Sequence, residues 1–371
     1  MKRILFIVSE DWYFVSHRLH LAISAINDGY KVALLSHISE HRIFLDSLSI
    51  ELIDWPLERM SKNPIKEVKS IHCIVDAIHS FKPDLVHAVA IKPVLYTSLV
   101  NFFLTINGVV LALGGLGFVF RSEKGSAKAI RIVIMPILRF LLTAKNTCLI
   151  VQNKDDRQIL EKLNISNNIE LIRGSGVNTK DFFSKPIPHK IPLVILPARI
   201  LWDKGVGDFV RCAKKCIANK VDVKFALVGA PDLHNPECVP EAQIKEWVEQ
   251  GVVEWWGHED DMFKVYNSAD IVCFPSYHEG LPKALLEAAS CELPIASYDV
   301  PGCREVVKDN VNGYLVPFKD EEKLFFSVMS LIKSSNLRDE MGKNGRKIVL
   351  ENFTQEKIYF ETMCAWKKFI E

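Results

Sequence analysis

The sequence predicts an α/β fold with two parallel, doubly wound sheets. Short apolar strands alternate with helical patterns, this alternation occurs twice along the chain, and a proline-rich segment separates the two occurrences. Strands that alternate with helices form parallel sheets, because each helix returns the chain to the edge where the previous strand began. With 371 residues, the chain is long enough for two such domains.

The predicted strands are short and rich in apolar residues, as expected for strands that are covered on both faces. In the first half they are Lys2–Val8, Tyr30–Ser36, Ile50–Trp55, Asp84–Ala90, Gly108–Leu113 and Asn146–Gln152. In the second half they are Ile191–Pro197, Val223–Val228, Val252–Trp256, Asp270–Phe274 and Leu293–Ser297. Beyond Gly313 the pattern is helical.

The segment from Phe182 to Pro192 predicts the boundary between the domains. It contains prolines at positions 186, 188 and 192, and these favour an extended connector over a helix. We therefore expect an amino-terminal domain over residues 1–183 and a carboxyl-terminal domain over residues 184–353.

The composition is that of a globular protein, with 49% hydrophobic and 25% charged residues. A net charge of +1 gives no general attraction to nucleic acid, and no nucleic-acid partner is expected. Residues 1–185 carry 23 Lys and Arg against 17 Asp and Glu, whereas the remainder is acidic. The basic half predicts an acidic partner or a membrane surface.

Cysteine usage and the amino-terminal sequence predict a cytoplasmic protein. The nine cysteines are scattered, and the closest of them, Cys212 and Cys216, lack zinc-site spacing, which is typical of a reducing compartment. The first apolar stretch, Ile4–Val8, is too short for a signal peptide or a membrane span.

The segment Ser276–Glu287, which reads S-Y-H-E-G-L-P-K-A-L-L-E, follows a predicted strand. A Gly-Leu-Pro turn that opens a helix directs free backbone N–H groups at an anion. Glu279 lies in the loop before this helix and Glu287 lies within it, so the two carboxylates can reach different parts of one extended ligand. On spacing alone, a solvated helix face is an equal alternative.

A second motif lies upstream, where Arg199 and Lys204-Gly205 follow the apolar strand Leu193–Ala198. Preorganised cations of this kind stabilise the charge that develops on a diphosphate leaving group. The alternative is a surface arginine and lysine without a ligand.

In this order, the two motifs resemble those of the retaining glycosyltransferases of family four, whose signature is E-x7-E. The resemblance implies the GT-B architecture, in which two Rossmann-like domains face each other across a cleft and a final helix, here 354–371, returns to the first domain. It also implies that Glu279 approaches the donor sugar, Glu287 binds the ribose hydroxyls, and Arg199 and Lys204 hold the diphosphate.

Further donor-binding residues follow from the same resemblance. They are Gly280, Leu281 and Pro282 in the turn, and Gly257 after the strand Val252–Trp256, where relatives bind the nucleobase. The two cations would replace the divalent metal of other transferase folds, and no aspartate pair with metal-like spacing accompanies the motifs. No metal and no other cofactor are therefore expected.

The acceptor is expected at the amino-terminal domain. Ser16 is predicted to cap a helix whose first turn contains His17 and Arg18, near the mouth of the cleft. His17 could act as a base or bind acceptor hydroxyls, or it could simply pack beside Trp12 or Tyr13.

The glycine-rich stretch Leu113–Phe118 departs from the family pattern, because many members carry a catalytic histidine there. Gly115 could let the backbone approach the diphosphate or the acceptor, or belong to a plain tight turn. Together with Lys92-Pro93 and Val151–Asn153, this stretch resembles the branch that builds lipid-linked bacterial surface glycans. That branch implies a uridine diphosphate sugar as donor and a polyprenyl diphosphate-linked acceptor.

The apolar run Ala127–Leu142 is interrupted by Lys128, Arg131 and Arg139. A basic amphipathic helix of this sort can lie in the headgroup plane of a membrane, which would make the protein peripheral on the cytoplasmic face of the inner membrane. A buried core helix with a kink at Pro136 is the alternative.

The reaction predicted is retaining transfer of a hexose or N-acetylhexosamine from a nucleotide sugar to a carbohydrate. The alternatives are a sugar-nucleotide epimerase of the same architecture and a non-catalytic nucleotide-sugar-binding protein. A nicotinamide-dependent oxidoreductase is disfavoured, because the segment Ser9–Ser16 contains no glycine.

Overall fold

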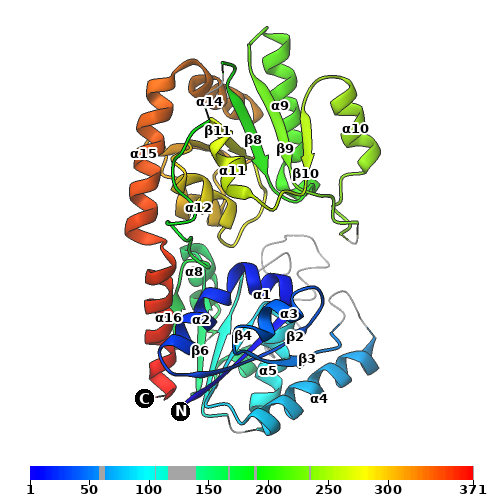
Figure 1. The fold of residues 1–371 in the computed structure, drawn as a ribbon, viewed down its shortest axis with the longest axis vertical. Coiled ribbons are helices and arrows are strands. Elements are labelled where there is room, and N and C mark those ends of the chain that lie inside the picture. Colours follow the sequence, from blue (N-terminus) through cyan, green and yellow to red (C-terminus); the bar gives the residue numbers. More distant parts are fainter. Residues whose placement is uncertain are drawn as a thin grey trace. The chain divides into compact units, whose positions relative to one another are not determined.

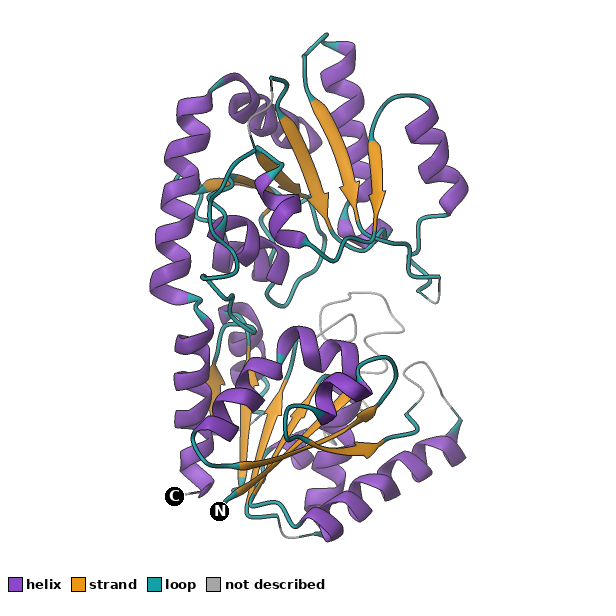
Figure 2. Cartoon of the chain, viewed as in Figure 1, coloured by secondary structure: helices purple, strands orange, loops and turns teal. Residues whose placement is uncertain are grey.

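The computed structural model describes residues 1–57, 63–104, 106–115, 139–165, 168–187, 190–233 and 235–370. The chain forms two compact units. Unit 1 comprises Met1–Ser175 and Glu356–Glu371, and unit 2 comprises Gly176–Gln355. Each contains one parallel sheet between helices (Figures 1 and 2), which confirms the predicted fold class.

Unit 1 has a seven-stranded sheet in the order β3-β2-β1-β4-β5-β6-β7, and neighbouring strands are parallel. The strands are β1 (Arg3–Glu10), β2 (Lys31–His37), β3 (Glu51–Asp54), β4 (Leu85–Val89), β5 (Gly108–Ala112), β6 (Thr147–Val151) and β7 (Ile169–Leu171). The chain builds outward from β1 to β3 and then resumes on the other side at β4. The topological switch point, where ligands bind in such sheets, therefore lies between β1 and β4.

Helices cover both faces of this sheet (Figure 1). They are α1 (Asp11–His17), α2 (Leu19–Asn27), α3 (Arg42–Asp46), α4 (Pro64–Phe81), α5 (Ile91–Phe103), α8 (Lys154–Lys162) and α16 (Gln355–Ile370). Along β1, Phe6 belongs to the core on the α2 and α16 face, whereas Leu5 and Ile7 belong to the core on the other face. Because both faces are buried, the strand is apolar from Ile4 to Val8.

The carboxyl-terminal helix α16 contributes to the core of unit 1. The Trp366 indole donates a hydrogen bond to His87 Nδ1 at 3.0 Å, and both side chains are buried. Phe369 packs on Gly108, where a Cβ atom would lie 2.3 Å from Phe369 Cβ. Burial, together with the nearby Arg18 charge, lowers the pKa of His87 to about 3, so His87 is neutral and its Nδ1 is a hydrogen-bond acceptor.

Unit 2 has a six-stranded parallel sheet in the order β10-β9-β8-β11-β12-β13. The strands are β8 (Leu193–Pro197), β9 (Lys224–Val228), β10 (Glu254–Gly257), β11 (Ile271–Phe274), β12 (Ile295–Tyr298) and β13 (Gly313–Val316). The helices are η1 (Trp202–Lys204, a 3-10 turn), α9 (Val206–Ala218), α10 (Glu241–Glu249), α11 (Met262–Asn267), α12 (Lys283–Ser290), α13 (Pro301–Val306), α14 (Glu321–Lys333) and α15 (Ser335–Asn352). The switch point of this sheet lies between β8 and β11.

Arg346, on α15, fixes α12 to the segment that enters unit 2. Its guanidinium donates to the carbonyl oxygens of Thr179, Phe182 and Ser290 at 3.0, 2.5 and 2.7 Å. Its planar, forked set of donors suits this purpose, because several carbonyl groups can accept from one side chain.

Two details of the sequence prediction are wrong. Residues Gly313–Val316 form strand β13 rather than part of a helix, and Gly313 is needed there because a Cβ atom would lie 2.0 Å from the Ile295 carbonyl oxygen. Ser16 does not cap a helix, because α1 already begins at Asp11. The buried Asp11 carboxylate accepts from the backbone of Trp12, Ser39 and His41, and this fixes the chain directly after β1.

Hydrogen bonds also determine the ionisation of Asp11. Burial by itself would raise the pKa of this carboxyl group, but the bonds from Ser39, His41 and Trp12 lower the pKa below its ordinary value.

Part of the predicted amphipathic segment Ala127–Leu142, including Pro136, lies outside the described residues, as do residues 116–118 of the glycine-rich stretch. Within the part of the chain that the structure describes, no helix has the length and apolar character needed to cross a membrane.

Candidate functional site

The residues of both predicted donor motifs follow the two strands that flank the switch point of unit 2. Arg199 and Lys204 come after β8, and Glu279 comes after β11. Since the carboxyl ends of parallel strands meet at one edge of a sheet, this topology brings together segments that are 75 residues apart in the chain.

Lys204 and Glu279 form the centre of this arrangement. Lys204 Nζ lies 2.7 Å from Glu279 Oε1, and the two side chains are 16% and 11% exposed. The buried Ser276 hydroxyl donates to the same oxygen at 2.7 Å. Among the described residues, no group donates to Glu279 Oε2, so this oxygen is available to accept from a ligand hydroxyl.

The main chain fixes the contact between the two motifs. The Tyr277 amide donates to the Asp203 carbonyl at 2.8 Å. Gly205, at φ +74°, is so close to the other loop that a Cβ atom would lie 1.9 Å from the Pro275 carbonyl oxygen. Both the left-handed backbone and the close approach require glycine, so the Lys204-Gly205 dipeptide has a packing role beside its charge.

The turn Gly280-Leu281-Pro282 leads into α12. Pro282 is the N-cap residue of this helix and no side chain caps it. Gly302, in α13, approaches the turn closely, since a Cβ atom there would lie 2.6 Å from the Gly280 carbonyl oxygen. An uncapped helix start of this kind presents N–H groups to an anion.

Glu287 lies in α12 and is only 6% exposed. The buried Tyr266 hydroxyl donates to Glu287 Oε2 at 3.0 Å, and Lys283 Nζ lies 3.1 Å from Oε1. Burial and the Glu287 carboxylate raise the pKa of Tyr266 well above its ordinary value, so this phenol keeps its proton and remains a donor.

Arg199 has a different partner from Lys204. Its guanidinium lies 2.7 Å from Asp232 Oδ2, and the side chain is 45% exposed. Gly257, at the end of β10, has φ +74° and accepts from the Gly229 amide at 2.6 Å. Gly229 in turn approaches Ala198, the residue before Arg199, where a Cβ atom would lie 2.0 Å from the carbonyl oxygen. The structure therefore brings Arg199, Lys204, Gly257 and Glu279 to the carboxyl edge of the sheet, whereas Glu287 lies within α12 and contacts Tyr266 and Lys283.

The predicted acceptor residues belong to unit 1. His17 ends α1 and its ring stacks on Tyr13 with centroids 4.3 Å apart, as in the packing alternative. Arg18 separates α1 from α2 and is only 3% exposed. It donates to the His17 carbonyl at 3.0 Å, and its buried Nε has no acceptor among the described residues.

Gly115 and Lys92 follow β5 and β4. The neighbouring Gly114 faces Tyr13, where a Cβ atom would lie 3.6 Å from the hydroxyl oxygen. Lys92 pairs with Glu67 at 2.9 Å. The structure thus brings His17 and the glycine turn close to Tyr13, while Lys92 has a carboxylate partner of its own.

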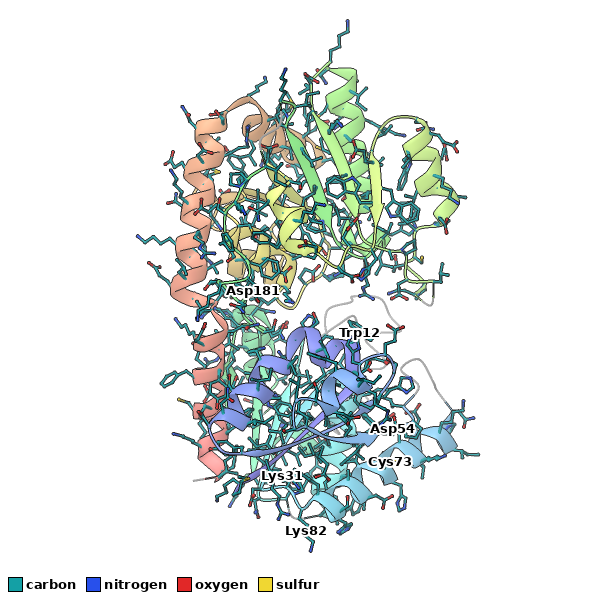
Figure 3. All side chains as sticks on the ribbon, viewed as in Figure 1. Trp12, Lys31, Asp54, Cys73, Lys82 and Asp181 are labelled. Carbon is teal, nitrogen blue, oxygen red and sulfur yellow. The ribbon has the colours of Figure 1, made fainter. Side chains whose placement is uncertain are left out.

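Figure 3 shows the two edges of the unit 1 sheet. Trp12 lies at the carboxyl edge, and Lys31 and Lys82 lie at the opposite edge.

Sequence reasoning missed several residues that contact the predicted ones. Ser276 lies within the motif, and a hydroxyl three residues before a candidate carboxylate is a signal that could have been used. Tyr266 and Asp232 lie on other elements, so only the fold identifies them as partners of Glu287 and Arg199. Among the described residues, no group of three or more His, Cys, Asp and Glu is arranged to hold a metal ion.

Comparisons with known families agree with these motifs. Residues 177–348 match the family "Glycosyl transferases group 1", and residues 3–153 match the family "Glycosyl transferase 4-like". Both candidate donor motifs lie within the first of these ranges.

Several relatives align with most of the chain, among them the following two. The N,N'-diacetylbacillosaminyl-diphospho-undecaprenol alpha-1,3-N-acetylgalactosaminyltransferase of Campylobacter jejuni is 26% identical over 321 residues, which cover 83% of this chain and 83% of that protein. The UDP-Gal:alpha-D-GlcNAc-diphosphoundecaprenol alpha-1,3-galactosyltransferase of Escherichia coli is 23% identical over 302 residues, covering 78% and 76%.

The fold is also that of solved structures. Sucrose-phosphate synthase from Thermosynechococcus elongatus superposes with a TM-score of 0.82 at 18% identity, covering 100% of this chain and 99% of that one. This likeness shows the fold, while the two family matches and the motifs show the ancestry. The chain belongs to the family-four glycosyltransferases, which have the GT-B fold.

Proposed function

We propose that this protein transfers a hexose or N-acetylhexosamine from a uridine diphosphate sugar, with retention of configuration, to a polyprenyl diphosphate-linked saccharide. The observation that carries the proposal is the Lys204–Glu279 pair at the switch point of unit 2. It joins a cation suited to a diphosphate with a carboxylate that keeps one oxygen for a sugar hydroxyl.

The donor would be bound by groups of both signs. Lys204 and Arg199 would neutralise the diphosphate, whose negative charge increases as the glycosidic bond breaks. The start of α12 would add backbone N–H groups, with Gly280, Leu281 and Pro282 shaping the turn. Glu279 would accept from the donor sugar, Glu287 from the ribose hydroxyls, and the nucleobase would lie at Gly257.

Both cations are paired with carboxylates, Lys204 with Glu279 and Arg199 with Asp232. When a diphosphate binds, each cation would therefore exchange its carboxylate partner for the diphosphate. Such an exchange avoids leaving a poorly exposed ammonium without an anion at any stage, which would be costly.

The acceptor class is proposed from the relatives, two of which are named for diphospho-undecaprenol or diphosphoundecaprenol substrates. In unit 1, His17, Arg18, Lys92 and Gly115 are the residues proposed to contact the acceptor. The basic charge of residues 1–185 suits a substrate that carries a diphosphate close to a membrane surface.

The proposal is tested by incubating the protein with uridine diphosphate hexoses and N-acetylhexosamines and a short-chain polyprenyl diphosphate-linked N-acetylglucosamine. Mass spectrometry would detect the extended product, and the anomeric proton coupling would report retention. The reaction should persist in excess EDTA, because side-chain cations hold the diphosphate.

Lys204→Ala should reduce transfer, and Lys224→Ala is its matched control. Lys224 also pairs with a glutamate, Glu254, but both side chains are exposed. Lys224→Ala should retain activity. Absence of both nucleotide binding and transfer in the wild-type protein would contradict the proposal, and isomerised donor formed without any acceptor would indicate an epimerase.

A further inference from the structure

Three exposed phenylalanine rings lie together on unit 1, at the end of α5 and in residues 139–142. Phe102, Phe103 and Phe140 are 57%, 73% and 61% exposed. The Phe102 ring contacts the rings of Phe103 and Phe140, with centroid distances of 5.1 Å in both cases. These three residues are called the phenylalanine patch below. Contiguous exposed apolar surface of this kind is typical of a site that contacts another molecule or a membrane.

Hydrogen bonds beneath the patch fix the two segments that carry it. Asn101, which is only 8% exposed, donates from Nδ2 to Asn146 Oδ1 at 3.1 Å, and Asn146 Nδ2 donates to Asn101 Oδ1 at 2.8 Å. Asn146 Nδ2 also donates to the Ile106 carbonyl at 2.7 Å, and Leu142 is buried in the core. The rings are therefore held at the surface by a framework whose own side chains are satisfied.

The charges of these segments have one sign. Residues 91–115 and 139–154 contain four Lys and Arg and no Asp or Glu. Arg139 and Lys145 are exposed, and within the described part of the chain neither has an ion-pair partner. Apolar rings beside exposed cations complement a surface that is both apolar and anionic.

A lipid bilayer matches this chemistry better than two other occupants. A second copy of the chain would bring the same cations together, and like charges across an interface are unfavourable. Single-stranded nucleic acid also stacks on aromatic rings, but it binds in positively charged grooves, whereas the net charge of the chain is only +1.

We infer that the phenylalanine patch, together with Arg139 and Lys145, attaches unit 1 to an anionic lipid bilayer. The rings enter the boundary between headgroups and acyl chains, and the two cations contact lipid phosphates. The choice of a bilayer rests on the proposed function, because a polyprenyl diphosphate-linked acceptor resides in a membrane.

The test is flotation of the protein with two kinds of vesicle, one of phosphatidylcholine and one of an equal mixture of phosphatidylcholine and phosphatidylglycerol. The wild-type protein should bind the mixed vesicles more tightly, and added salt should weaken this binding because it screens the cations. Phe103→Ser and Phe140→Ser should each lower the partition coefficient about fivefold, and the double variant about 25-fold. Because both rings are exposed, the thermal midpoints should match that of the wild type.

Phe360→Ser is the matched control for the loss of an exposed ring. Phe360 lies on α16 of the same unit and is 68% exposed, but Glu361 follows it directly. An acidic neighbour disfavours contact with anionic lipid. The partition coefficient of this variant should therefore equal that of the wild type.

The contribution of the cations is tested by Arg139→Gln combined with Lys145→Gln. This pair should remove the preference for the mixed vesicles. Lys214→Gln combined with Lys347→Gln changes the net charge by the same amount at exposed lysines of unit 2 and should keep the preference.

Three results would overturn the inference. The first is a wild-type protein that does not bind the mixed vesicles, and the second is a double phenylalanine variant that binds them as well as the wild type does. The third is an unchanged partition coefficient accompanied by loss of a dimer in sedimentation or of binding to a single-stranded oligonucleotide, which would assign the patch to a second copy or to nucleic acid.

Sugar transfer separates this inference from the proposed function. With a short-chain acceptor in solution, both phenylalanine variants should keep the wild-type kcat/KM. With a long-chain acceptor in mixed vesicles, KM should rise as the partition coefficient falls, while kcat stays unchanged. If the wild-type protein transfers no sugar at all, the proposed function fails, and flotation still decides whether the patch binds lipid.

Discussion

The two sheets share one strand order around their switch points, yet the charged residues at these points are arranged in opposite ways. In unit 2, Lys204 and Glu279 pair with each other across two loops, and both side chains remain partly exposed. In unit 1, Arg18 is buried, and its charge, together with burial, lowers the pKa of His87. The same strand order thus gives a partly exposed ion pair at the switch point of unit 2 and a buried arginine at the switch point of unit 1.

In these two sheets, the switch point has an ion pair where both neighbouring loops carry charged side chains that can pair with each other. In unit 2, glycines let two loops touch through their main chains, and the charges pair across that contact. In unit 1, the Asp11 carboxylate accepts hydrogen bonds from the loop after β2, and the ring of His17 stacks on Tyr13.

The largest effect is expected from Gly205→Ala. A Cβ atom would lie 1.9 Å from the Pro275 carbonyl oxygen in a left-handed backbone, so the two loops must separate. We expect a loss of about 3 kcal/mol or more in the free energy of unfolding, together with loss of nucleotide binding. Thermal unfolding with and without uridine diphosphate measures both.

Gly251→Ala is the control for backbone strain. Gly251 has φ +67° but no atom within 4 Å of its added Cβ, so only the left-handed strain of about 1–2 kcal/mol should appear, with binding retained. Equal losses of unfolding free energy in the two variants would show that the close approach of Gly205 to the Pro275 carbonyl does not contribute to stability.

Next in size is Lys204→Ala, which removes one cation and leaves the poorly exposed Glu279 without its ion-pair partner. A charge-assisted hydrogen bond is worth about 1.5–3 kcal/mol, so affinity for uridine diphosphate should fall roughly tenfold to a hundredfold. Isothermal titration measures the change. An unchanged affinity would remove Lys204 from the donor site.

In unit 1, lowering the pH should reduce the free energy of unfolding, because the imidazole of His87 is neutral in the folded protein. Its pKa is about 3 in the folded protein against an ordinary value of 6.5, so the unfolded chain binds the proton first as the pH falls. The titration of His87 does not lower the free energy of unfolding above pH 6.5. Between pH 6.5 and about pH 3, it lowers the free energy of unfolding by up to about 1.4 kcal/mol per pH unit.

His87→Asn tests this dependence, because an amide oxygen can still accept from Trp366 but does not titrate in this range. The thermal midpoint of the variant should depend less on pH between 6.5 and 4.5 than that of the wild type. Identical pH profiles would contradict the assignment of the effect to His87.

The smallest effect on stability is expected from Arg18→Met. Among the described residues, the Arg18 side chain makes one hydrogen bond. Replacing a buried charge of this kind by an apolar side chain of similar length is often neutral or stabilising, so the free energy of unfolding should change by no more than about 1 kcal/mol. The exposed Arg42, paired with Asp54, provides the control Arg42→Met. A selective fall in kcat/KM for the acceptor would support the proposed role of Arg18, whereas a loss of several kcal/mol would show that the charge stabilises the fold.

The sequence by itself determined the fold class and most of the strands, because strands buried on both faces must be apolar and leave a periodic signal. It also indicated the residues of the two candidate donor motifs, since each motif is local and follows a strand that can be recognised. It missed strand β13, whose four residues are stabilised by pairing with β12 rather than by their own pattern.

The tertiary structure decided which of these residues meet. Nothing local indicates that Glu287 accepts from Tyr266, that Arg199 pairs with Asp232, or that Trp366 donates to His87, 279 residues away. Pairing energies depend on distance and burial, and for residues distant in sequence both are fixed only when the strands come together. Sequence therefore determined the chemistry available at each loop, and the fold determined the partners.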